Sequence, residues 1–74
     1  MKITGTRSYI DVVIDEKEIR IFGEMIVGGF VAYKDSIKVW DKPTGETIDE
    51  DTKNDIIRKV TEKTKNSHMV IVFE

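Results

Sequence analysis

The sequence predicts an α+β fold of one domain, residues 1–74, in which one helix packs on a mainly antiparallel sheet of about five to six short strands. Three observations predict this two-layer sandwich. Apolar and polar residues alternate along the first half of the chain, which is the period of half-buried strands. A later segment places its aliphatic residues at helical spacing. A short and almost continuously apolar run follows that segment.

The first predicted hairpin is formed by two alternating segments. In 8–14 the isoleucines and valine at even positions fall on one face of a strand. The polar residues 15–17 form the turn, and the alternation resumes through 19–22. Gly23 then marks a bulge or a bend, because glycine inside a strand weakens it unless the backbone needs the freedom.

The second predicted hairpin turns at Gly28-Gly29. Apolar residues at 25–27 and 30–33 flank this pair, and primed turns need positive φ at both central positions. A further short strand is predicted over 37–40, after a polar tripeptide.

A loop over 41–47, which contains the only proline, precedes the predicted helix. The helix begins between Thr47 and Asp49, either of which can cap it, and Thr47 with Glu50 has the capping-box pattern. It ends near Lys65-Asn66, where asparagine can adopt the left-handed cap. The core-facing residues share one side of the helix: Ile56, Ile57, Val60 and Thr64. The final apolar run, 68–73, predicts a strand that is covered on both faces.

Composition excludes several function classes. The chain has no cysteine, which leaves no disulfide or thiolate-held metal, and it shows neither a signal-peptide pattern nor a membrane-spanning stretch. We therefore expect a soluble cytoplasmic protein. Twelve basic and 14 acidic residues give a net charge of −2, which argues against binding to nucleic acid or to an anionic membrane. The negative charge is concentrated in residues 35–51, which contain six acidic residues and only two lysines and so have a net charge of −4.

No residue pattern indicates catalysis, so we expect neither an enzyme nor a cofactor. The only histidine, His68, lacks a nucleophile in an activating context and is interpreted as a strand-end residue. Consecutive acids at 49–51 point in different directions on a helix, which disfavours a metal site and favours compensation of the helix dipole. Gly28-Gly29 precedes a strand and lacks the lysine of a phosphate loop.

Because no catalytic or metal site is predicted, we expect the protein to act by binding through its surface. Trp40 is interpreted first as a core residue, with an anchor in a protein interface as the alternative. The acids around it form either an interface or only the charge compensation of a helix start. The candidate partner-binding residues are Tyr33, Asp35, Trp40, Asp41, Glu46, Asp49, Glu50 and Asp51.

Scattered residues along nearly the whole chain resemble a known group of proteins. They are Gly5-Thr6, Gly23-Glu24, the stretch from Phe30 to Ile37, Trp40, Pro43 and Ile56-Ile57. At these positions the chain resembles the small immunity proteins of bacterial polymorphic-toxin and contact-dependent inhibition systems. Within that group it is similar to the immunity protein 74 type.

This resemblance implies a cytoplasmic protein that binds and neutralises a cognate toxin domain. Many such toxins are nucleases with basic clefts, which an acidic edge would complement. The alternative is a structural, assembly or adaptor module that acts through protein binding or homo-oligomerisation. Monomer and weak homo-oligomer both remain open from the sequence.

Overall fold

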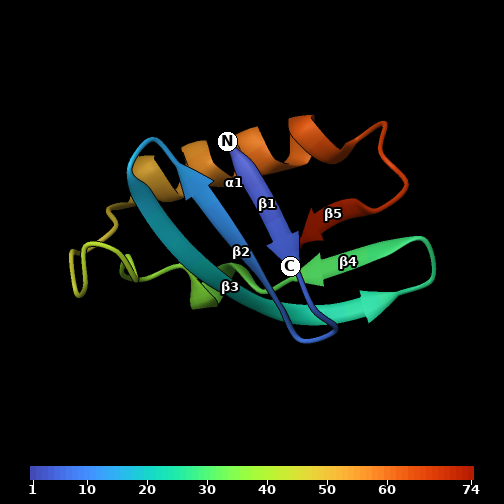
Figure 1. The fold of residues 1–74 in the computed structure, drawn as a ribbon, viewed down its shortest axis with the longest axis horizontal. Coiled ribbons are helices and arrows are strands. Elements are labelled where there is room, and N and C mark those ends of the chain that lie inside the picture. Colours follow the sequence, from blue (N-terminus) through green and yellow to red (C-terminus); the bar gives the residue numbers. More distant parts are fainter.

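The computed structural model describes residues 1–74 as a curled sheet with one α-helix laid across it (Figure 1). The elements in chain order are β1 (Lys2–Gly5), β2 (Tyr9–Ile14), β3 (Lys17–Ile26), β4 (Gly29–Ala32), the short 3-10 helix η1 (Lys34–Ser36), α1 (Glu50–Thr64) and β5 (Val70–Phe73).

The strand order in the sheet is the order in the chain, β1-β2-β3-β4-β5. The first four strands pair antiparallel, whereas β5 pairs parallel to β4. Parallel neighbours need a long crossover, and the segment with η1 and α1 between β4 and β5 supplies it. The predicted α+β fold, one helix on a mainly antiparallel sheet, is confirmed with five strands.

The long strand β3 holds the two halves of the sheet together. Its first part, 17–22, pairs with β2, and its last part, 23–26, pairs with β4. Gly23 lies at this change of partner. A Cβ there would collide with the carbonyl oxygen of Val31 and with the ring of Phe30. The glycine therefore permits a close approach of β4 inside a continuous strand.

The core lies between α1 and the concave face of the sheet. Ile10 and Val12 of β2 and Ile56 and Val60 of α1 are all buried, as the predicted strand and helix faces require. The complete set of buried apolar residues is Ile10, Val12, Ile19, Ile21, Phe30, Ala32, Ile37, Trp40, Ile48, Ile56, Val60 and Ile71.

Two strand predictions were wrong. Residues 37–40 form no strand, because Ile37 and Trp40 both point into the core at a spacing of three, which strand alternation does not permit. The final strand, β5, lies at the edge of the sheet, and Val72 on its outer face is 44 % exposed. In addition, β1 was not predicted; its four residues contain a single half-buried aliphatic, Ile3.

The helix starts at one of the two predicted caps, but without the capping box of Thr47 and Glu50. Asp49 is the N-cap, and its Oδ1 accepts a hydrogen bond from the Thr52 N–H at 2.8 Å. Thr47 instead forms an isolated antiparallel β-bridge with Val39. At the other end Asn66 is not left-handed, since Asp15 is the only non-glycine residue with positive φ.

The β3–β4 hairpin is present, but its turn is shifted by one residue from the prediction. Ile26 pairs with Gly29, so Val27 and Gly28 are the central residues. Only Gly28 has positive φ, at 79°. Gly29 lies in β4, where a Cβ would collide with the Val70 carbonyl of β5. The two glycines therefore serve different needs.

Candidate partner-binding surface

Acidic residues gather at the end of the molecule where α1 begins. Three segments that are distant in the sequence meet there: the β2–β3 turn, the loop 41–47 and the first turn of α1 (Figure 1). Lys17 Nζ at the start of β3 lies 2.6 Å from Glu46 Oε1 in the loop. A groove with a volume of about 650 Å³ lies between the turn and α1, and Asp15 and Asp55 line it. The fold thus adds acids from the turn to those that are neighbours in the sequence.

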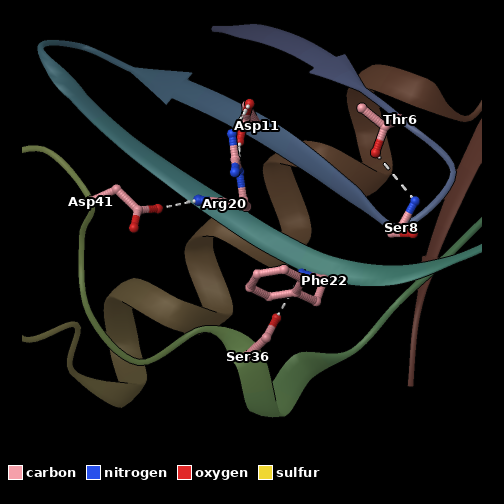
Figure 2. Close-up of polar contacts among 7 residues, drawn as sticks. All are labelled: Thr6, Ser8, Asp11, Arg20, Phe22, Ser36 and Asp41. Atoms are coloured by element: carbon pink, nitrogen blue, oxygen red, sulfur yellow. Dashed lines mark hydrogen bonds and ion pairs between the residues drawn. The ribbon is translucent and has the colours of Figure 1, made fainter.

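Asp41, one of the predicted contact residues, holds the fold together at this end. Its Oδ2 accepts a hydrogen bond from the backbone N–H of Arg20 at 2.6 Å (Figure 2). Its own carbonyl accepts a hydrogen bond from the Thr44 hydroxyl at 3.1 Å. The carboxylate of Asp41 is therefore occupied by the backbone of β3.

η1 and the segment that follows it seal the outer edge of β3 in the same way at two further points. The Glu18 N–H donates to the Lys42 carbonyl at 2.9 Å. The Phe22 N–H donates to the Ser36 hydroxyl oxygen at 3.1 Å (Figure 2). Where β4 does not reach, side chains and irregular backbone thus replace a neighbouring strand.

Glu46 and Asp49 are also engaged within the molecule. Glu46 forms the ion pair with Lys17, and Asp49 caps α1. The hydrogen bond from the Thr52 backbone to the Asp49 carboxylate lowers the pKa of Asp49 below its usual value. Of the two interpretations of Asp49, the geometry thus supports charge compensation at the start of the helix over an interface contact.

Four other acids at this end are exposed and take part in no ion pair. Glu50 and Asp51 belong to the predicted set, and both lie in the first turn of α1. Asp15 and Glu16, at the tip of the β2–β3 hairpin, were missed by the sequence analysis. A count of charges along the chain could not find them, because it does not show that the β2–β3 turn lies next to the start of the helix.

Tyr33 and Asp35 lie away from this group. η1 runs beside β3 at Phe22, whereas the loop 41–47 meets β3 at Glu18, about 13 Å along the strand. The exposed Tyr33 hydroxyl lies 3.4 Å from Glu24 Oε2. The negative charge of Glu24 raises the pKa of Tyr33. The predicted residues therefore do not form one compact patch.

Trp40 is buried in the core, so the alternative of an exposed interface anchor does not fit the structure. Only 5 % of its surface is accessible, and the Lys17 Nζ lies 5.5 Å from the centre of its ring. A side chain this covered cannot enter a pocket of a partner without unfolding the loop. The interpretation of Trp40 as a core residue is confirmed.

Comparison with known proteins identifies the family. The model of the family Immunity protein 74 matches residues 2–74. The chain belongs to this family. No curated protein and no solved structure matches the chain.

The immunity protein also carries an aromatic and arginine cluster on the outer face of its sheet, which the sequence analysis did not single out. The guanidinium of Arg20 lies 3.8 Å from the centre of the Tyr9 ring and binds both carboxylate oxygens of Asp11, at 2.9 and 3.2 Å. The Tyr9 and Phe22 rings meet edge to face at 6.2 Å. Phe22 is 51 % exposed. The alternation along the two predicted strands could have indicated this cluster. Its residues all occupy outward positions of β2 and β3, where Tyr9 pairs with Phe22 and Asp11 with Arg20.

The remaining polar groups of the immunity protein form no cluster with obvious chemistry. No group of three or more histidine or carboxylate side chains is placed to hold a metal ion. His68 is exposed in the segment before β5, and the hydroxyl of its neighbour Ser67 lies within hydrogen-bond distance of two backbone carbonyls. None of the helices combines the length and the apolar character that crossing a membrane requires.

Proposed function

We propose that this immunity protein binds a cognate toxin domain in the cytoplasm and neutralises it by occupying its surface, without catalysis of its own. The observation that carries the proposal is the family match along residues 2–74. The surface of the protein offers charged and apolar side chains for binding by contact.

The acidic end of the molecule is the surface that we assign to a toxin with a basic cleft, such as a nuclease. Asp15, Glu16, Glu50 and Asp51 are exposed and form no ion pair within the molecule, so their carboxylates are free to contact a partner. A basic cleft that binds phosphate would attract this end and speed the encounter. Asp35 is also exposed, but it lies on η1 away from this end and is not part of the proposed contact surface.

The acids that are bonded within the fold have a supporting role in this proposal. Asp41 and Asp49 hold the edge of β3 and the start of α1, respectively. The exposed acids depend on both elements for their positions. Replacing Asp41 or Asp49 therefore tests the fold as well as the interface, which makes them poor probes of binding.

The proposal is tested with the protein encoded by the gene next to that of this chain, by measuring its toxic activity and its affinity for the immunity protein. Reversal of three free acids (Glu16→Lys, Glu50→Lys and Asp51→Lys) is expected to weaken binding about tenfold or more at low salt and to flatten its salt dependence. Toxin activity should recover in parallel.

A matched control removes the same charge elsewhere, with Glu24→Lys, Glu62→Lys and Glu74→Lys. Its net charge equals that of the first variant, so a general attraction would be weakened equally in both. Equal losses, or no loss in either, would refute the acidic interface. A toxin that keeps its full activity in the presence of the unaltered protein would refute neutralisation itself.

A further inference from the structure

An apolar cleft lies at the opposite end of α1 from the acids. It has a volume of about 450 Å³ and lies between the two edge strands, β1 and β5, beside the last turn of α1. These strands are the first and the last in the sheet order, and they approach each other because the sheet curls (Figure 1). The apolar side chains that line the cleft are Ile3, Ile10, Met25, Phe30, Met69 and Ile71.

One wall of the cleft is a strand edge with free backbone groups. The Thr6 N–H donates to the Tyr9 carbonyl at 2.8 Å, which fixes the hydrogen-bonding alternation between β1 and β2. Thr4 therefore faces β2, and the N–H and C=O groups of Ile3 and Gly5 face away from it, toward the cleft. No strand lies on that side of β1. A row of unpaired amides and carbonyls is a template for an extended polypeptide.

The opposite wall offers no such template. The Ile71 N–H of β5 donates to the Thr64 hydroxyl oxygen at 3.1 Å, and that hydroxyl lies 2.9 Å from the Val60 carbonyl. The last turn of α1 thus occupies the amide of Ile71, the β5 residue that lines the cleft. Within the cleft, an added strand therefore finds free backbone amides on β1.

The shape and chemistry of the cleft favour bulky apolar side chains. Met25 and Met69 are 44 % and 41 % exposed beside it, and methionine adapts to different apolar partners. The volume lies within the range of about 300–1,000 Å³ that is usual for ligand pockets. A second copy of this chain would be a poor occupant, because the inward-facing residues of its own β1 are only Ile3 and Gly5.

We propose that an extended segment of the toxin partner adds as a strand to the free edge of β1. Its apolar side chains, at alternate positions, fill the cleft between Met25 and Met69. An acidic side chain of the segment pairs with Lys63, the only charged residue that lines the cleft. This inference rests on the proposed function, since it takes the toxin as the partner.

Amide hydrogen exchange of the full chain, free and in complex with the product of the neighbouring gene, tests the inference. The Ile3 and Gly5 amides should exchange quickly in the free protein and at least about tenfold more slowly in the complex. A complex in which these two amides exchange as fast as before would overturn the added strand while leaving neutralisation intact. Absence of any complex would overturn both proposals.

Substitution in the cleft provides a second, independent measurement. Met25→Glu and Met69→Glu place a charge where we expect desolvated apolar contacts, and each should weaken toxin binding about tenfold or more. The matched control is Val72→Glu, at a residue with the same 44 % exposure as Met25 but on the outer face of β5. Equal effects at all three positions would contradict the cleft. Protection of Ile3 and Gly5 that rises with concentration without toxin would assign the edge to a second copy, and would also contradict it.

Discussion

The carboxylate oxygen Oδ2 of Asp41 lies 2.6 Å from the backbone nitrogen of Arg20 and accepts its hydrogen bond. β3 is ten residues long, but β4 covers only its last four, which leaves the outward amides of its first part without a neighbouring strand. A side chain supplies the missing acceptor at Arg20, and a hydroxyl supplies it at Phe22. The edge of β3 is thus closed by residues of specific chemistry.

We expect Asp41→Ala to destabilise the protein by about 1 kcal/mol, because the Arg20 amide loses its acceptor in a partly exposed site. Asp41→Asn is the control, since its side-chain carbonyl can still accept the bond, and it should recover most of the loss. Urea unfolding measures both effects. Faster amide exchange at Arg20 in Asp41→Ala, without a change in β1, would locate the loss; equal stability of both variants would show that water replaces the carboxylate.

Sequence periodicity was sufficient for the elements that bury one regular face. The alternation in β2 and the spacing of Ile56 and Val60 in α1 both place buried residues correctly, because burial alone decides those faces. It failed for Ile37 and Trp40, whose burial comes from an irregular segment packed along β3. It also failed for β1, which is mostly exposed and is defined by pairing with β2.

The candidate surface was predictable only in part for a related reason. The charge count found Glu50 and Asp51, which are neighbours in the sequence. It could not find Asp15 and Glu16, which the β2–β3 hairpin brings to the same end. Nor could it separate the free acids from Asp41, whose partner is a backbone amide 21 residues away.

Gly28 and Gly29 should respond differently to the same substitution. Asparagine tolerates positive φ, and nothing lies within 4 Å of an added Cβ at Gly28, so Gly28→Asn should leave stability nearly unchanged. Gly29→Asn should destabilise by about 2 kcal/mol, because its Cβ would push β5 away at the Val70 carbonyl. Thermal unfolding of the pair measures the difference. Equal losses would indicate that both glycines are needed for the turn.

The hydroxyl of Thr64 should matter more than its methyl group. Thr64→Val keeps the buried shape but leaves the Ile71 N–H without an acceptor, at a cost of about 1–3 kcal/mol. Thr64→Ser keeps the hydroxyl and should lose less. Chemical denaturation compares the two, and hydrogen exchange at Ile71 reports the bond directly. A Thr64→Val protein as stable as Thr64→Ser would show that the link between α1 and β5 is packing alone.

Asp49 should contribute to the acid sensitivity of the fold. Its pKa is lowered in the folded state, so its contribution is present above the unfolded value of about 3.9 and is lost as the pH falls through the folded value. Asn caps helices as well as Asp does but does not titrate, so Asp49→Asn should lose less stability than the unaltered protein between about pH 5 and pH 2. The remaining loss of stability includes the contribution of Asp55, whose pKa is lowered by hydrogen bonds from Lys59 and Arg58.

Thermal unfolding across this pH range is the measurement. Asp51→Asn is the control, because it removes a first-turn charge and leaves the cap in place. If Asp51→Asn flattened the acid limb as much as Asp49→Asn, the general charge of the helix start rather than the cap would be responsible.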